Sequence, residues 1–247
     1  MKTELRKKRF VILVGSKGGL GKSFMARLIL DLIRRLGIIH VAYDADPENP
    51  DLYRYYNSSE NSVEQVNFFG VADSTKVLEK MYKDTPDVVL LDLPASSGNG
   101  MRDIFTKFGL LETAVELGYR ITLVFVINTD NPVIASVDAM YNFSTDKVDY
   151  VIAKNLCWSK ETAFEMWNNS KIRKTLIDDC KAIEIEIPAL DDTAFLALSK
   201  AKTPFSAATK EVVGFGSSLL VRGFMMTSQA ELDKAGEYLG LVKNVKQ

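Results

Sequence analysis

The sequence predicts an α/β protein with a doubly wound, mostly parallel sheet and helices on both faces. Short apolar runs alternate with amphipathic stretches almost throughout the 247 residues. The apolar runs lack polar alternation, which is typical of strands that are covered on both faces. This alternation of strand and helix indicates parallel strands joined by helical crossovers. Because such sheets bind ligands at the carboxyl ends of their strands, functional residues are expected directly after the strands.

Each apolar run predicts a strand, and each amphipathic stretch predicts a helix. The expected strands cover residues 10–15, 38–44, 62–69, 88–93, 121–128, 148–153 and 183–187. The expected helices cover residues 22–36, 74–83, 101–117, 133–143 and 160–177, and most of the chain after residue 188 is also expected to be helical. No linker rich in proline and glycine divides the sequence. We therefore expect one domain over residues 1–247, with a core of about 9–210 and C-terminal helices over 211–247.

The composition excludes several classes of protein. With 31 basic and 32 acidic residues the net charge is −1, so contact with nucleic acid would need a local basic patch. Cys157 and Cys180 are too few for a disulfide framework and lack a C-x-x-C metal spacing. No apolar run reaches the roughly 18 residues of a membrane span. These features favour the cytoplasm, and association with the nucleoid stays open.

Three minor features favour structural or solvated roles. The basic start over residues 1–9 is interpreted as a solvated tail, in preference to a signal peptide or a DNA-binding arm. The segment 158–174 mixes aromatic, basic and acidic residues, which favours a solvated amphipathic helix over a DNA-contacting one. His40, the only histidine, lies in an apolar strand context, and we expect a structural role for it.

The most specific motif lies between the first strand and the first helix. It has the sequence Ser-Lys-Gly-Gly-Leu-Gly-Lys-Ser over residues 16–23. Glycines let backbone N–H groups turn inward around phosphate oxygens, and the helix N-terminus adds its positive dipole end. Lys22 can reach the β- and γ-phosphates of a nucleotide, and the hydroxyl of Ser23 can ligate Mg²⁺. The strict phosphate-loop pattern is missed only at Ser16, where a glycine is expected.

The run from Lys17 to Ser23 resembles the deviant Walker A motif K-G-G-x-G-K-[ST] of the ParA/MinD group of ATPases, in which the position of Ser16 is variable. The resemblance implies that Lys17 reaches the nucleotide of a second subunit and that Lys22 is the ordinary phosphate lysine. A cation delivered only on dimerisation would stabilise charge on the transferring phosphoryl group. The nucleotide contacts expected from the loop are Gly18, Gly19, Leu20, Gly21, Lys22, Ser23 and the following Phe24.

Carboxylates follow two further strands. Asp44 and Asp46 end the strand 38–44 in the order D-x-D-P, and Asp92 follows four apolar residues, as in a Walker B strand. Both patterns match the ParA/MinD group, as does the loop over residues 95–100, which resembles a switch loop that senses the γ-phosphate. We expect Ser23, Asp44 and Asp92 to bind Mg²⁺, directly or through water, and Asp46 to orient the attacking water.

The downstream half extends the resemblance to roughly residues 9–210. Asn155 ends a strand where the ParA/MinD group places an asparagine that contacts adenine, and Pro188 matches a step that borders the base. The segment 201–204 is similar to a short basic, proline-containing segment of the group. Asn49, near the place of a usual glutamine, resembles the plasmid conjugation and mobilisation branch of the TraL/MobD type.

The resemblance implies an ATP- and Mg²⁺-binding ATPase that forms a homodimer with ATP and hydrolyses ATP slowly until a protein partner stimulates it. Its role would be plasmid partition or stabilisation, conjugation or protein positioning. Non-specific DNA is a candidate track. Membrane anchoring through residues 228–247 is not expected, because acidic residues dilute that segment. The alternative is a metabolic ligase or kinase on the same fold, similar to dethiobiotin synthetase; a pseudo-ATPase scaffold is disfavoured.

Overall fold

The computed structural model describes residues 8–15, 17–57, 62–95, 97–128, 131–157 and 164–242. Its centre is a sheet of seven strands in the order β3-β2-β4-β1-β5-β6-β7. The strands are β1 (Lys8–Val14), β2 (His40–Asp44), β3 (Glu64–Gln65), β4 (Val88–Asp92), β5 (Tyr119–Ile127), β6 (Asp149–Asn155) and β7 (Ile183–Ile187). Every pair of neighbours is parallel. The predicted doubly wound α/β class is thereby confirmed.

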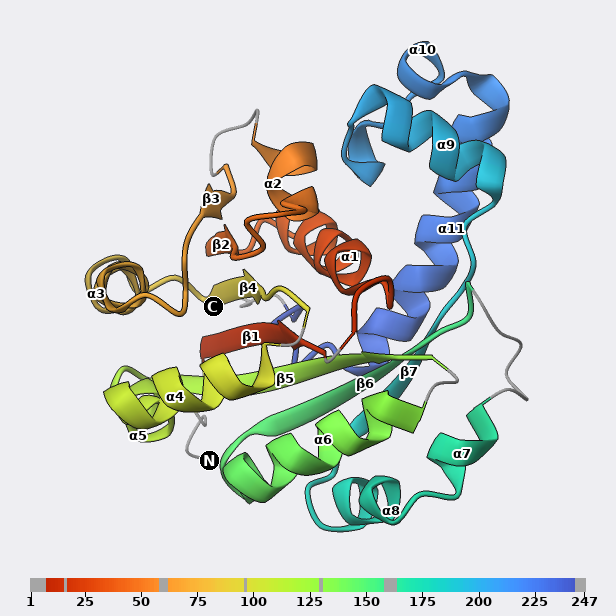
Figure 1. Cartoon of the computed structure of the whole chain (residues 1–247). Helices are drawn as coiled ribbons and strands as arrows, with labels where there is room; N and C mark the ends of the chain where they lie inside the picture. Colours follow the sequence, from red (N-terminus) through yellow and green to blue (C-terminus); the bar gives the residue numbers. More distant parts are fainter. Residues whose placement is uncertain are drawn as a thin grey trace, which may run out of the picture.

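Helices cover both faces of this sheet. Figure 1 shows α1 and α11 on one face and α4, α5, α6 and α8 on the other. The α-helices are α1 (Lys22–Arg35), α2 (Asp51–Tyr56), α3 (Val71–Asp84), α4 (Gly98–Phe108), α5 (Leu110–Glu116), α6 (Asn131–Ser144), α7 (Glu165–Asn168), α8 (Lys171–Asp178), α9 (Asp192–Ala201), α10 (Lys210–Val213) and α11 (Phe215–Lys234). The 3₁₀ turns in the described ranges are η1 (Thr145–Lys147) and η3 (Phe205–Ala207). Strands β1 and β4 to β6 are almost entirely buried, as their unbroken apolar runs predict.

Several expected elements are wrong in extent. The single helix expected over 101–117 is two helices, because Gly109 takes a left-handed conformation (φ 53°) that ends α4 and starts α5. The strand expected over 62–69 is only Glu64–Gln65. The loop expected over 95–100 is shorter, since α4 begins at Gly98; Gly100 packs so closely on Phe69 that an added Cβ would lie 2.8 Å from its ring. Ser96 lies outside the described residues.

The helix expected over 160–177 is also divided in its described part, into α7 and α8. Ser170 begins α8 as an N-cap, with its hydroxyl accepting a hydrogen bond from the backbone N–H of Arg173 at 3.2 Å. Arg173 pairs with Glu184, and the buried Trp167 donates to the same carboxylate. Trp167 of α7 and Arg173 of α8, both from the segment expected to form a solvated amphipathic helix, are therefore bonded to β7 through Glu184. Residues 158–163 lie outside the described ranges.

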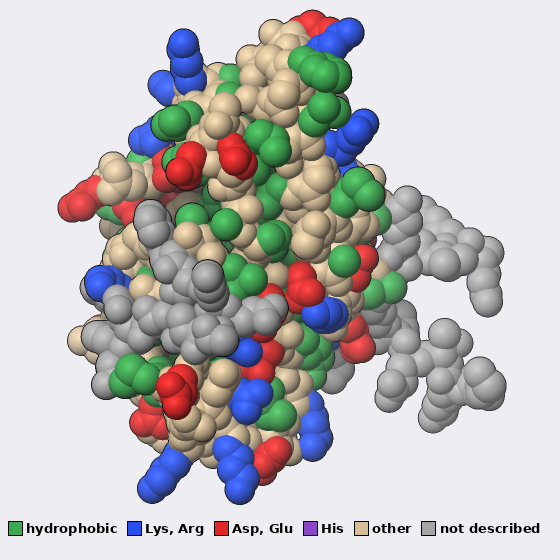
Figure 2. All heavy atoms as spheres, turned by 90° about the vertical axis from the view of Figure 1, so that its right-hand side faces the viewer, with side chains coloured by type: hydrophobic (Ala, Val, Ile, Leu, Met, Phe, Trp, Pro, Cys, Tyr) green, Lys and Arg blue, Asp and Glu red, His purple; other side chains and the backbone are tan. Residues whose placement is uncertain are grey.

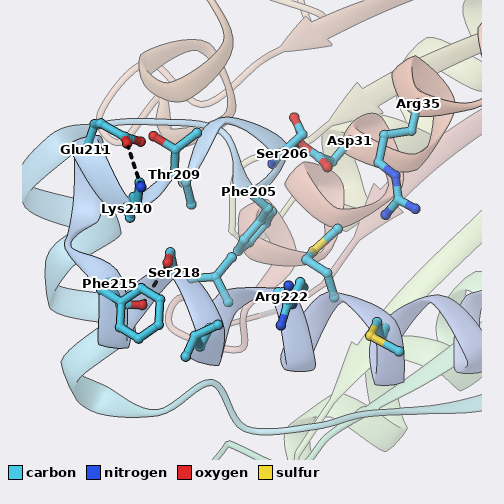
Figure 3. Close-up of a pocket in the computed structure, with 15 residues that line it drawn as sticks. Asp31, Arg35, Phe205, Ser206, Thr209, Lys210, Glu211, Phe215, Ser218 and Arg222 are labelled. Carbon is cyan, nitrogen blue, oxygen red and sulfur yellow. Dashed lines mark hydrogen bonds and ion pairs between the residues drawn. The ribbon is translucent and has the colours of Figure 1, made fainter.

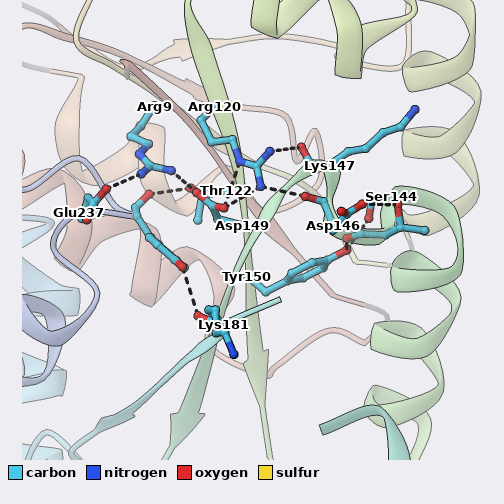
Figure 4. A network of polar contacts seen from close by, with 12 residues as sticks. Arg9, Arg120, Thr122, Ser144, Asp146, Lys147, Asp149, Tyr150, Lys181 and Glu237 are labelled. Carbon is cyan, nitrogen blue, oxygen red and sulfur yellow. Dashed lines mark hydrogen bonds and ion pairs between the residues drawn. The ribbon is translucent and has the colours of Figure 1, made fainter. Parts of the chain in front are cut away.

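A polar network closes the sheet at the end opposite the carboxyl ends of its strands (Figure 4). Arg9 is 5% exposed and pairs with Asp149, while Glu237 lies 3.6 Å from its guanidinium. Arg120 also donates to Asp149, at 3.0 Å from Nε. For Arg9, the expected solvated tail is wrong, because β1 already starts at Lys8 and buries it. Residues 1–7 lie outside the described part of the chain.

The C-terminal segment packs against this same end of the sheet. The hydroxyl of Thr122 donates to the backbone oxygen of Tyr238 at 2.6 Å, and Leu232, Leu239 and Leu241 are buried. The part of the predicted segment 228–247 that the structure describes is thus largely an internal packing element; residues 243–247 lie outside it. None of the helices in the described ranges has the length and apolarity that a membrane span requires.

Candidate nucleotide-binding site

The loop between β1 and α1 has a backbone that glycine makes possible. Gly19 and Gly21 have φ values of 77° and 97°, in the left-handed region that other residues rarely adopt. A Cβ at Gly21 would also lie 2.6 Å from Nδ2 of Asn155, whereas nothing lies within 4 Å of the Cβ position at Gly18. Gly21 therefore leaves room for the side chain of Asn155, and Gly18 leaves open space beside the loop. Ser16 lies outside the described residues.

The two lysines of the loop differ in exposure. Lys17 is exposed, whereas Lys22 is 7% exposed and its Nζ lies 3.3 Å from the backbone oxygen of Lys17. Burial lowers the pKa of Lys22, and the carboxylates of Asp92 and Asp46 oppose that change. Lys22 is thus held beside acidic groups at the loop, and Lys17 lies on the outside.

Two carboxylates lie side by side at the ends of neighbouring strands. Asp44 ends β2 and Asp92 ends β4, and the two residues are in register. Asp92 is fully buried, and neither of its oxygens has a hydrogen-bond partner of good geometry among the described residues. Burial raises the pKa of Asp92 to about 8; the nearby Ser23 hydroxyl opposes this rise and the Asp44 carboxylate adds to it. Such an orphaned carboxylate is suited to a cation that arrives with a ligand.

The residues present fit Mg²⁺ only with help from a phosphate ligand. Within the described ranges, no three histidine, cysteine, aspartate or glutamate residues converge as a ready-made metal site. Magnesium is usually held by one or two carboxylates together with substrate phosphates and water. Ser23, Asp44 and Asp92 offer that kind of partial set beside the loop.

The loop after β2 is organised by its own carboxylates. Asp44 accepts hydrogen bonds from the backbone N–H groups of Asp46 and Tyr53, both at 3.0 Å. Burial raises its pKa to about 6, and these two hydrogen bonds oppose the rise. Asp46 in turn accepts from the N–H groups of Glu48 and Asn49, at 3.0 and 2.9 Å. Asp46 is therefore fixed at the edge of the cleft, with one carboxylate oxygen committed to the turn.

Asn155 lies at the end of β6 and contacts the loop. Its Nδ2 donates to the backbone oxygen of Leu20 at 2.8 Å, and its Oδ1 accepts from the N–H of Cys157 at 3.0 Å. Leu20 itself is buried, so its side chain packs in the core beneath the phosphate loop. Pro188 follows β7 on the same side of the cleft.

A cleft of about 1770 Å³ connects these groups. The sequence-predicted residues that line it are Gly18, Gly19, Gly21, Lys22, Ser23, Phe24, Asp44, Asp46, Asn155 and Pro188. Lys17, Leu20 and Asp92 do not line it: Lys17 is exposed, and the other two are buried. The cleft exceeds the roughly 300–1,000 Å³ of a typical small-molecule pocket, so a nucleotide fits within it.

An aromatic and cationic cluster at the cleft contains one residue predicted from the sequence, Phe24, and was otherwise not predicted. The Arg27 guanidinium lies 3.5 Å from the ring centroid of Tyr55 and 4.8 Å from that of Phe205. Phe24 packs edge-on against Phe205, with 5.3 Å between centroids. The one sequence signal is the spacing of Phe24 and Arg27, three residues apart on one face of α1. Their partners come from α2, which was not predicted, and from η3.

Comparisons with known proteins agree with the motifs. No model of a protein family matches the chain. Protein MobD of Acidithiobacillus ferrooxidans is 26% identical over 208 residues, which are 83% of this chain and 88% of MobD.

Two solved MinD structures share the fold. MinD of Aquifex aeolicus superposes with a TM-score of 0.50 at 16% identity, covering 88% of this chain and 97% of that one. The septum site-determining protein MinD of Pyrococcus horikoshii, complexed with Mg-ADP, gives 0.51 at 14% identity, covering 96% and 99%. The chain thus resembles MobD in sequence and has the fold of the MinD-type P-loop proteins, as the deviant phosphate-loop motif predicts.

Proposed function

We propose that this chain is an ATPase of the ParA/MinD type, acting as an ATP-gated dimer switch. The observation that carries the proposal is the convergence of the loop 17–21, the buried Lys22 and the paired carboxylates Asp44 and Asp92 at one edge of the sheet. The MinD structure with Mg-ADP supports the nucleotide and the metal. Mg²⁺ would be held by Ser23, Asp44 and Asp92 and would supply neutralising charge at the phosphates.

Each residue of the site has a distinct proposed task. The loop N–H groups and Lys22 bind and orient the phosphates. Asp46 orients the attacking water, since its position at the cleft edge is fixed by two hydrogen bonds from its own turn. Lys17 is exposed, as a residue that reaches a second subunit must be. Asn155 and Pro188 border the adenine. The loop after Asp46 and residues 94–95 both line the cleft, so both would respond to the γ-phosphate.

The likeness to MobD supports a role in plasmid mobilisation, partition or positioning, with a protein partner that stimulates hydrolysis and with non-specific DNA as a candidate track. The whole chain of residues 1–247 would form this one ATPase unit. A cytoplasmic location, with association to the nucleoid if DNA is the track, follows from that role.

Sedimentation of two lysine variants tests the switch. Lys17→Ala is expected to keep ATP binding and to lose the ATP-dependent dimer, because only the trans contact is removed. Lys22→Ala is expected to lose ATP binding itself. A normal ATP-dependent dimer and normal turnover in Lys17→Ala would overturn the dimer switch while leaving nucleotide binding intact.

Turnover of the purified chain separates the switch from the metabolic alternative. Slow hydrolysis that DNA or a protein raises supports the switch, whereas fast turnover that requires a small molecule supports a ligase or kinase. DNA binding by Asp46→Ala with ATP tests the track, because that variant would be trapped before hydrolysis.

A further inference from the structure

A second cavity, away from the phosphate loop, lies between α1, η3 and α11. Its volume is about 670 Å³ (Figure 3). We call it the α11 groove and define it by Phe205, Phe215, Leu219, Met226, Arg35 and Arg222. Its size is within the range of pockets that accept a few side chains of a ligand. None of the residues predicted from the sequence to bind nucleotide lines it.

Several apolar side chains of the α11 groove are exposed. Phe215 and Met226 are 68% and 70% exposed, and Leu219 is 41% exposed. Val212 and Leu220 add to the exposed apolar surface nearby. Figure 2 shows hydrophobic side chains spread over this face of the molecule, with acidic and basic side chains among them. Exposed apolar side chains that line a concave surface are available to contact a partner.

Two arginines at the rim of the groove indicate the charge of a partner that would bind there. Arg35 from α1 and Arg222 from α11 both lie along the groove (Figure 3). Arg35 donates to the neutral Gln229 at 3.0 Å, and within the described ranges no carboxylate forms an ion pair with Arg35 or Arg222. Lys210 and Glu211 neutralise each other at 3.7 Å. The exposed rim is therefore positive and matches an acidic partner.

The carboxylate of Asp31 is buried below the groove and does not pair with Arg35 or Arg222 at the surface. It is 1% exposed and accepts hydrogen bonds from the hydroxyl of Tyr56 at 3.1 Å and from the hydroxyl of Ser206 at 2.9 Å. These contacts tie η3 to α1 and form the floor of the groove. Buried hydrogen bonds therefore hold the floor of the groove.

We propose that the α11 groove docks an acidic, amphipathic segment of a partner protein. Apolar side chains of the segment would fill the cavity, and its acidic side chains would pair with Arg35 and Arg222. A second copy of this chain fits less well, because a two-fold contact would bring the positive rim of one copy against the positive rim of the other. A lipid surface is flat and cannot reach the floor of a concave site. The groove also shares Phe205 with the aromatic cluster beside the nucleotide cleft.

Selection from a displayed library of amphipathic peptides on the nucleotide-free chain tests the docking site independently of ATP. The selected peptides are expected to carry acidic residues beside apolar ones. The double variant Arg35→Glu/Arg222→Glu should weaken their binding by at least about tenfold, and Leu219→Ser should weaken it as well. The matched controls Lys107→Glu/Lys174→Glu and Tyr82→Ser change exposed residues elsewhere and should bind as the wild type does.

Three outcomes would overturn the proposal. The first is a selected set without acidic residues, or one whose binding the groove variants leave unchanged. The second is self-association in sedimentation that the groove variants abolish. The third is binding to phosphatidylserine vesicles that the same variants abolish. Thermal unfolding followed by circular dichroism confirms that each variant is folded, which is expected because every substituted residue is exposed.

Discussion

Asn155 donates a side-chain hydrogen bond to the backbone oxygen of Leu20, with 2.8 Å between Nδ2 and the oxygen. This bond joins the end of β6 to the phosphate loop across 135 residues of sequence. Among the described residues, the backbone oxygen of Leu20 accepts no backbone hydrogen bond from a helix or strand, so the amide of Asn155 supplies its partner. The bond therefore fixes the conformation of the loop before any ligand binds. The asparagine that resemblance assigns to adenine is therefore also a support for the loop.

Asn155→Ala is expected to weaken binding of inorganic tripolyphosphate as well as of ATP, by roughly 5- to 30-fold, because one buried hydrogen bond of about 1–2 kcal/mol is lost. Isothermal titration of both ligands is the measurement. Asn142→Ala, an exposed asparagine on α6, is the matched control and should change neither affinity. If ATP binding falls while tripolyphosphate binding stays, the side chain acts on the base and not on the loop.

Gly21 and Gly18 allow a sharper test of the same loop. Gly21→Ala combines a left-handed φ of 97° with a Cβ only 2.6 Å from Asn155 Nδ2. We expect the nucleotide-free chain to lose about 1–3 kcal/mol of unfolding free energy in urea titrations. Gly18→Ala meets nothing within 4 Å and should match the wild type or gain slightly. Equal losses in both variants would show that the loop is not held by Asn155.

The phosphate loop and the carboxylates could be predicted because each is a contiguous pattern at the end of a buried strand. The apolar runs 38–44 and 88–93 predict the two strands, and a parallel sheet brings their carboxyl ends together. The register of Asp44 with Asp92 is the consequence. A site residue can therefore be predicted from the sequence where the local spacing and the order of the strands determine its position.

The remaining features depend on contacts between distant segments. Helix α2 has only six residues, too few to show a helical period, and Arg27 stacks on its Tyr55. The division of 101–117 depends on one left-handed glycine, which sequence periodicity does not reveal. The burial of Arg9 requires Asp149, 140 residues away. No local pattern contains these pairings.

The network around Arg9 is expected to stabilise the fold without affecting ligand binding. Asp149 accepts from both Arg9 and Arg120 (Figure 4), so Asp149→Ala removes the carboxylate that the two guanidinium groups share. Among the polar partners in the described ranges, Arg9 would keep only the exposed Glu237, and Arg120 would keep only backbone oxygens. We expect a loss of about 3 kcal/mol in unfolding free energy, measured by urea titration, with unchanged ATP affinity. Glu112→Gln removes an exposed pair with Lys147 at 3.0 Å and should cause no measurable change. Equal effects of the two substitutions would mean that burial of the network adds nothing.

Glu184 should make the stability depend on pH in the acid range. Burial alone would raise the pKa of Glu184, but hydrogen bonds from Arg173 and Trp167 and the charge of Lys154 lower it below the ordinary 4.5. The folded chain therefore binds this proton more weakly than the unfolded chain does. The stabilisation is complete above pH 4.5 and is lost as the pH falls through the lower pKa of the folded state.

Glu184→Gln tests that dependence directly. At pH 7 the variant should lose about 1–3 kcal/mol of unfolding free energy, because two charge-assisted bonds from Arg173, at 2.9 and 2.7 Å, become weaker. The difference from the wild type should shrink steadily as urea titrations are repeated from pH 5 towards pH 3. Glu79→Gln, which removes an exposed pair with Lys83, should track the wild type at every pH. A difference that stays constant with pH would show that Glu184 acts by packing and not by its charge.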